Sequence, residues 1–222
     1  MAGSILGNRV ARTEDPELLT AGGTYVYDVD LPGVTHAVFV RSPFAHALVG
    51  DIDIAEAEAA PGVVAVHTGR TIGLDPGHGF VKVDDAFARH PIAVDRVRFV
   101  GEAVAVVVAE TLAEAQDAAE LVFVDYEPLP VLVDPEAALD AEVSLFDGKP
   151  DNLAITATDP ATDVLAEADV VVRGRYLNQR LAAAPIEPNS AAAAVGDDGR
   201  VTVWAATQMP HLLQRQLAGA TG

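Results

Sequence analysis

The sequence predicts a mixed α+β fold, built around a strand, a helix and a second strand in the stretch 101–130. Residues 103–109 form a continuous apolar run with four valines, which is typical of a strand buried on both faces. Thr111 and Glu114 follow in the T-x-x-E pattern of a capping box, which predicts the start of a helix. Residues 121–126 are rich in β-branched and aromatic side chains, so we expect a second strand there, ended by two prolines.

Shorter strands are expected on the N-terminal side of this core. Residues 35–41 and 47–52 alternate between apolar and polar side chains, and we predict two neighbouring strands separated by a break at 42–45. The remaining elements expected in this half are a short acidic helix over 54–59, a strand over 63–66 and a strand over 97–100.

Between residues 68 and 90 the periodicity disappears, and glycines and aspartates predict a long loop. A loop of this length is uncommon inside a compact domain unless it is functional or mobile. It contains His78, His90 and three aspartates, so a zinc or hard-cation site is one interpretation. The alternative is that these side chains form turns and face solvent, because the six histidines of the chain show no i, i+4 ligand spacing. We therefore assign no metal ligand.

After Pro130 the character of the sequence changes, and we place a domain boundary near residues 135–150. The elements expected beyond it are a short helix over 134–139, a helix over 161–168, a long strand over 169–180, a hairpin of 191–195 with 201–206 turning at Asp198-Gly199, and a helix over 210–219. These elements are too few for an independent core, which predicts that they pack on a larger body.

An excess of acidic residues limits the partners of this chain. The sequence has 33 Asp and Glu against 14 Lys and Arg, a formal net charge of −19, which repels nucleic acid and anionic membrane surfaces. It has no cysteine, which excludes disulfides, cysteine-ligated zinc, Fe–S clusters held by this chain and a thiol nucleophile. With no signal-peptide pattern and no apolar run long enough to span a membrane, we expect a cytoplasmic protein.

The motifs of nucleotide binding and of serine hydrolases are missing. The glycine pairs 69/73 and 77/79 lack the preceding strand, the following helix and the Lys-Ser/Thr of a phosphate loop. The nucleophile motif G-x-S-x-G does not occur in the sequence.

Two positions remain as candidates for chemistry. Glu187 lies between two prolines, where it is either a placed acid or, as we favour, a cap or loop-anchoring carboxylate. Thr207 and Gln208 lie on a strand-to-helix corner, where backbone N–H groups of the helix start are exposed. The Gln208 amide offers a donor and an acceptor to an oxo or phosphate ligand. The alternative for this corner is a plain helix cap.

Six segments follow one another along nearly the whole chain: EDPELLTAGGTYVYD, LPGVTHAVFVRSPFAHALVGDID, PGVVAVHTG, VGEAVAVVVAETLAEAQDAAELVFVDYEPLP, VVRGRYLNQRLAAAPIEP and VTVWAATQMPHLLQ. This succession resembles the large subunit of the molybdenum hydroxylases, the family of xanthine dehydrogenase, aldehyde oxidase and aerobic carbon monoxide dehydrogenase. Family large subunits are several times longer, so the resemblance is to their N-terminal portion.

The resemblance implies a polar N-terminal segment (1–21), an α/β hammerhead domain (22–135) and the incomplete beginning of an α/β molybdopterin-binding domain (136–222). In the family, the glutamine of the strand-end Thr-Gln motif lies beside the molybdenum centre. That motif matches Thr207-Gln208, so Gln208 is the one cofactor-binding residue carried over, and no catalytic residue or metal ligand is assigned. The R-S-P and A-H-A patterns within residues 41–47 match a family hallmark that we interpret as structural.

The chain also departs from the family pattern. Asn189 follows Glu187-Pro188 where the family often has arginine. The glycine-rich G-G-G-F-G loop, the substrate-selecting loop and the general-base glutamate of the family are absent from the sequence. The resemblance therefore implies one part of a large subunit, from a split gene or a truncated reading frame, that is inactive as the isolated chain.

The implied enzyme is a molybdenum-cofactor-dependent hydroxylase or dehydrogenase that acts on an aldehyde, an N-heterocycle or CO, with water as the oxygen source. Its electrons pass to Fe–S clusters and FAD on partner subunits, and the expected partners are these subunits, the C-terminal part of the large subunit and a small-molecule substrate. The alternative is a non-catalytic assembly or scaffold protein, or a remnant, that keeps the hammerhead fold. The sequence selects neither the substrate nor the oligomeric state.

Overall fold

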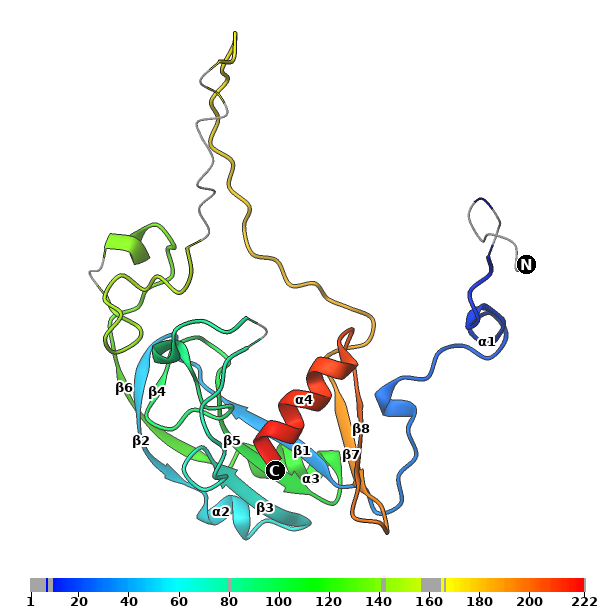
Figure 1. The fold of residues 1–222 in the computed structure, drawn as a ribbon. Coiled ribbons are helices and arrows are strands. Elements are labelled where there is room, and N and C mark those ends of the chain that lie inside the picture. Colours follow the sequence, from blue (N-terminus) through cyan, green and yellow to red (C-terminus); the bar gives the residue numbers. More distant parts are fainter. Residues whose placement is uncertain are drawn as a thin grey trace. The chain divides into compact units, whose positions relative to one another are not determined.

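The computed structural model describes residues 7, 10–79, 81–140, 143–156, 165 and 167–221. The chain divides into two compact units, one formed by Val34–Gly174 and the other by Met1–Gly33 together with Arg175–Gly222. Helices and strands are mixed in the larger unit, which confirms the α+β prediction (Figure 1). Each unit is described by itself below.

The named strands of the larger unit form two antiparallel three-stranded sheets (Figure 1). The first has the order β1 (His36–Arg41), β5 (Ala103–Ala109), β3 (Val63–Thr68). The second has the order β4 (Arg96–Val97), β2 (Ala47–Asp53), β6 (Phe123–Pro128). Sheet pairing thus joins strands that are distant in the sequence, and β5 is the central strand of the first sheet.

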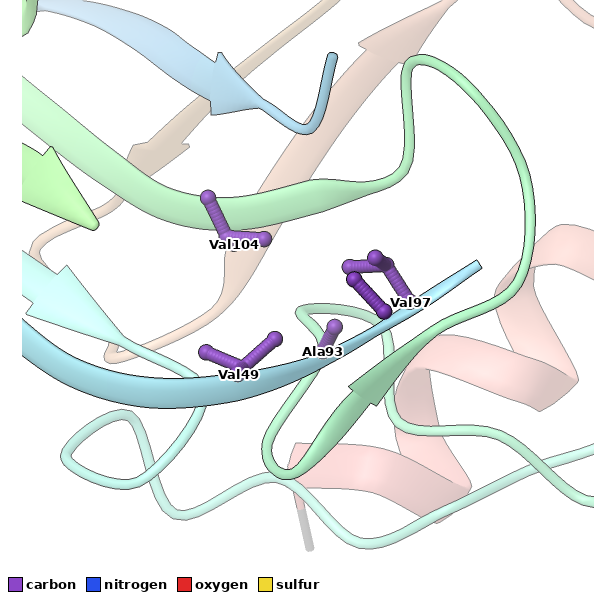
Figure 2. Close-up of a cluster of buried hydrophobic side chains, with 5 residues drawn as sticks. Val49, Ala93, Val97 and Val104 are labelled. Atoms are coloured by element: carbon purple, nitrogen blue, oxygen red, sulfur yellow. The ribbon is translucent and has the colours of Figure 1, made fainter. Parts of the chain in front are cut away.

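Strand β5 is buried on both faces, as its uninterrupted apolar run predicts. On one face, Val104 packs with Val49 of β2, Val97 of β4 and Ala93, so this cluster lies between the two sheets (Figure 2). On the opposite face, Val107 packs with residues of β3 and of the two helices α2 (Ala55–Glu58) and α3 (Leu112–Ala119). The unit is therefore layered as helices, sheet and second sheet around this one strand.

Helix α3 begins with the predicted capping box. The Glu114 N–H donates to Thr111 Oγ1 at 3.2 Å, and the Thr111 N–H donates to Glu114 Oε2 at 3.0 Å. Gly62, in the turn before β3, has φ +73°, and a Cβ there would collide with the Glu114 carboxylate. The cap is thus packed directly against the neighbouring turn.

Two strand predictions for this unit are corrected by the structure. Strand β2 does not pair with β1 but belongs to the second sheet, because the chain turns from one sheet to the other at Ser42. The strand expected over 97–100 is only the two-residue β4. It ends early because the buried Glu102 carboxylate accepts the Arg98 N–H at 2.6 Å and Gly101 turns the chain with φ +89°.

The 42–46 connection between β1 and β2 is held by buried polar groups. Ser42 is buried, its N–H donates to the Glu102 carbonyl at 2.8 Å, and its Oγ accepts from the Phe44 N–H at 3.0 Å. His46 is buried as well, with Nδ1 at 2.7 Å from the Pro130 carbonyl oxygen. These contacts agree with the structural interpretation of the R-S-P and A-H-A patterns.

The smaller unit contains the predicted hairpin and the predicted C-terminal helix. Strands β7 (Ala191–Val195) and β8 (Val201–Ala205) pair antiparallel, with Gly199 at φ +76° in the connecting turn. Helix α4 (Pro210–Thr221) follows. The remaining elements of the chain are α1 (Asp15–Thr20) and the 3₁₀ turns Val26–Asp28, Asp85–Phe87 and Ala137–Asp140.

The long strand predicted over 169–180 is wrong for this structure, because no strand is assigned within the described range 167–190. Residues 167–186 are exposed throughout, and no neighbouring backbone completes a ladder there. The helix predicted over 161–168 falls mostly outside the described residues. Among the helices that the structure describes, none is both long and apolar enough to cross a membrane.

Candidate functional site

The candidate residue Gln208 lies in the smaller unit, on the corner between β8 and α4 (Figure 1). Its side chain is exposed, and so is that of Thr207. Thr207 Oγ1 accepts the Met209 N–H at 3.1 Å, and the Met209 carbonyl accepts the Leu213 N–H at 3.0 Å. Thr207 thus holds the turn that leads into α4, and the Gln208 amide, which has no hydrogen-bond partner among the described residues, is available to a ligand.

The start of α4 also presents backbone donors. Pro210 occupies the first helical position, where its missing N–H costs no hydrogen bond. The next N–H, that of His211, has no acceptor among the described residues. An exposed amide side chain and an open helix N-terminus thus lie within four residues, a combination suited to binding oxygen atoms of an anionic group.

A buried hydroxyl lies at the same end of the hairpin. The Ala206 N–H donates to the Ser190 carbonyl at 3.0 Å, so the pairing of β7 and β8 extends to the residue next to Thr207. Ser190 Oγ is buried and has no hydrogen-bond partner in the described part of the chain. An unpaired buried hydroxyl is costly, so this atom is able to bond a polar group of a ligand at this end of the hairpin. The donors at this corner therefore fit an oxygen-rich cofactor.

Glu187 is an anchor, as the loop-anchoring interpretation predicts. Its Oε1 accepts the Val26 N–H at 2.9 Å, which ties the segment before β7 to the 3₁₀ turn Val26–Asp28 in the same compact unit. The two residues are 161 positions apart in the sequence. This contact fixes the backbone that leads into Ser190 and the hairpin.

The histidines of the long loop 68–90 contact atoms of the loop itself. Within the described residues, no group of three His, Asp or Glu side chains is arranged to hold a metal ion. His78 Nε2 lies 3.0 Å from Asp85 Oδ1, and His90 Nδ1 lies 2.9 Å from the Leu74 carbonyl oxygen. These histidines stabilise the loop itself.

Residues 144–149, which the sequence analysis did not identify as important, contact this loop. Lys149 Nζ pairs with Asp84 Oδ2 at 2.5 Å, and the Phe146 ring packs on Phe87 with 4.9 Å between centroids. The Arg98 guanidinium lies 4.6 Å from the centroid of the Phe146 ring. No local sequence pattern predicts these pairs, because each one joins residues at least 48 positions apart.

Two of these charged groups have shifted pKa values. Hydrogen bonding to Lys149 lowers the pKa of Asp84, with a further contribution from the Ala86 N–H. Burial lowers the pKa of Arg98, and the nearby Arg96 adds to this effect.

Comparison with protein families finds two matches, in order along the chain. Residues 20–130 match the "Aldehyde oxidase and xanthine dehydrogenase, a/b hammerhead domain". Residues 145–222 match the "Molybdopterin cofactor-binding domain", the range that contains Ser190 and Gln208. The two matches support the expected succession of hammerhead and cofactor-binding regions.

Curated relatives are similar over nearly the whole chain. The large subunit of nicotine 6-hydroxylase from Paenarthrobacter nicotinovorans is 37% identical over 97% of this chain. The carbon monoxide dehydrogenase large chain from Afipia carboxidovorans is 32% identical over 98% of it. These alignments cover only 27% and 29% of the two relatives, so the chain spans about a quarter of their length.

Solved structures show the same fold. Quinoline 2-oxidoreductase from Pseudomonas putida 86 matches with a TM-score of 0.80 at 38% identity, covering 95% of this chain and 28% of that one. The Cu,Mo-CO dehydrogenase matches with a TM-score of 0.77 at 30% identity, covering 97% and 29%. The fold of the chain is thus that of part of known large subunits.

Proposed function

Because the chain belongs to the aldehyde oxidase and xanthine dehydrogenase family, we propose that it is the N-terminal part of the large subunit of a molybdenum-dependent hydroxylase or dehydrogenase. The observation that carries this proposal is the succession of a hammerhead region and a molybdopterin-binding region along one collinear match. The complete enzyme oxidises an aldehyde, an N-heterocycle or CO, with water as the oxygen source. This substrate range is supported by relatives named as a nicotine hydroxylase, a carbon monoxide dehydrogenase and a xanthine dehydrogenase.

In this proposal Gln208 is the residue that faces the molybdenum-molybdopterin cofactor. Its exposed amide would hold an oxygen atom of the cofactor, and the open His211 N–H would supply a second donor. Thr207 and Glu187 position this corner and the adjoining segment without reaching the cofactor. When bound, the cofactor supplies the two-electron redox chemistry, and this chain contributes neutral donors that orient it.

Other parts of the assembly complete the reaction. A general base and the glycine-rich cofactor loop come from the C-terminal part of the large subunit, so the isolated chain does not turn over substrate. Fe–S clusters and FAD on partner subunits receive the electrons, which agrees with a chain that has no cysteine. We place the assembly in the cytoplasm.

Activity measured on the chain alone and in complex tests this proposal. The purified 222-residue chain, reconstituted with molybdopterin and supplied with an artificial electron acceptor, is expected to hydroxylate neither an aldehyde nor a purine. The same chain co-produced with the C-terminal part and the partner subunits is expected to oxidise at least one substrate of the three classes. Turnover by the chain alone, or an inert complete assembly that retains no molybdenum, would contradict the proposal.

A further inference from the structure

A shallow pocket of about 280 Å3 lies in the larger unit. It is lined by the end of β1 and by the turn between β4 and β5, and its charged residues are Arg41, Arg89 and Glu102. Strand β1 is an edge strand of the first sheet, so nothing in that sheet covers this side of the pocket. The proposed cofactor site at Gln208 uses none of these residues.

The pocket carries one uncompensated positive charge. Arg89 pairs with the buried Glu102 carboxylate, with 3.4 Å between Nη1 and Oε1. Arg41 donates from Nη1 to the Gly101 carbonyl at 2.9 Å, and no carboxylate of the described residues pairs with it. Two guanidiniums against one carboxylate leave a surplus of one positive charge on a chain whose formal net charge is −19. A positive site on such a surface selects an acidic ligand.

The guanidiniums are fixed in place by aromatic rings. Arg41 lies over the Phe39 ring at 5.5 Å, and Arg89 lies over the Phe99 ring at 5.2 Å. Both rings are about half exposed, Phe39 at 47% and Phe99 at 45%, which is unusual for phenylalanine. Preorganised cations beside exposed rings combine the features that recur at the centres of protein interfaces.

We propose that this pocket is a docking site for an Asp or Glu side chain, flanked by an apolar residue, from the C-terminal part of the large subunit. The inference rests on the proposed function, which supplies that partner. A single carboxylate neutralises the surplus charge and matches the planar fork of a guanidinium. A dianion such as phosphate would leave excess negative charge on an already acidic chain. Because the chain as a whole is acidic, a positive pocket favours one register of the contact and also strengthens it.

The test measures binding of the 222-residue chain to the C-terminal part of its large subunit by titration calorimetry at low and high NaCl. Arg41→Gln is expected to weaken binding at least tenfold and to reduce the dependence on salt. Arg41→Lys keeps the charge and is expected to retain most of the salt dependence. The matched control is Lys82→Gln, which removes one exposed charge from the same unit and is expected to change the dissociation constant less than twofold.

Arg89→Gln leaves the buried Glu102 without its ion pair, so this variant is informative only if the chain stays folded. Near-ultraviolet circular dichroism of every variant checks that it does. Arg41→Gln binding as tightly as Lys82→Gln, in a complex that forms and holds molybdopterin, would overturn the docking site and leave the proposed function standing. No complex with the wild-type chain would overturn both.

Discussion

Two valine-rich stretches of this chain, β5 over Ala103–Ala109 and the segment 169–180, have opposite structures. Strand β5 pairs with β1 on one side and β3 on the other, and Val104 and Val107 are fully buried on its two faces. In the second stretch Val170 is 79% exposed and Tyr176 is 91% exposed, with no strand assigned. A segment rich in β-branched residues is therefore able to form a strand, but whether the strand forms depends on the partner strands that are available.

The difference suggests what the second stretch lacks. It belongs to the range that matches the molybdopterin-binding domain, and the chain covers about a quarter of its relatives. We expect the apolar side chains of 169–180 to be buried by the C-terminal part of the large subunit.

The largest expected effect is a difference in unfolding free energy between a charged substitution in β5 and the same substitution in 169–180. Val107→Asp places a charge in the closed core of β5 and is expected to lower the free energy of unfolding by about 4 kcal/mol or more, enough to unfold the larger unit. Val172→Asp makes the same change in an exposed segment and is expected to stay within about 0.5 kcal/mol of wild type. Denaturant unfolding measures both, and equal losses would contradict the contrast.

Hydrogen exchange, measured with and without the C-terminal part of the large subunit, sharpens the comparison of the two stretches. In the isolated chain the amides of 103–109 are expected to exchange slowly and those of 169–180 near the rate of an unfolded peptide, because only the first set is hydrogen-bonded in a sheet. Adding the C-terminal part of the large subunit is expected to slow exchange in 169–180 at least tenfold. Unchanged exchange in a complex that demonstrably forms would show that this stretch is a linker.

A smaller effect is expected from the helix that follows β5. Thr111→Ala removes the hydroxyl that accepts the Glu114 N–H and is expected to cost about 1 kcal/mol of unfolding free energy. Thr24→Ala is the matched control, since Thr24 is exposed and lies outside the larger unit. Identical unfolding curves for the two variants would mean that the capping box adds nothing to the core.

The smallest effect concerns the exposed pair Asp84–Lys149. Lys149 lowers the pKa of Asp84 in the folded chain, so the pair stabilises the fold above the usual carboxyl pKa of 3.8 and is lost as pH falls through the lowered value. The difference in Tm between wild type and Asp84→Asn is therefore expected to be present at pH 7 and to vanish in strong acid. Asp75→Asn, in the same loop, serves as the control. A difference that persists unchanged to pH 2 would rule out the ion pair as its cause.

Local patterns predicted what local forces determine. The strand at Ala103–Ala109, the capping box at Thr111 and the hairpin turn at Gly199 follow from short-range periodicity and turn chemistry. The sheet that receives β2 was missed because the turn at Ser42 is held by the carbonyl of Glu102, 60 residues away. The early end of β4 was missed because it depends on the buried carboxylate of Glu102 accepting the Arg98 N–H, which no strand pattern predicts.

The candidate site shows the same division. The strand-to-helix corner at Gln208 was predictable from the end of a β-pattern followed by proline, and its link to a cofactor came from a family resemblance. The unpaired hydroxyl of Ser190 and the pairing of Arg89 with Glu102 carry no sequence signal, because burial and long-range contact create them.

The most direct test of the central claim is the molybdopterin content of the complex between this chain and the C-terminal part of its large subunit. Gln208→Ala is expected to reduce cofactor affinity by about 10- to 100-fold, measured as pterin fluorescence per purified complex after dilution. The matched control is Gln216→Ala, which removes another exposed amide, from α4, and is expected to retain the cofactor fully. If the Gln208 variant keeps as much cofactor as the Gln216 variant, then Gln208 does not hold it and the proposed site is wrong.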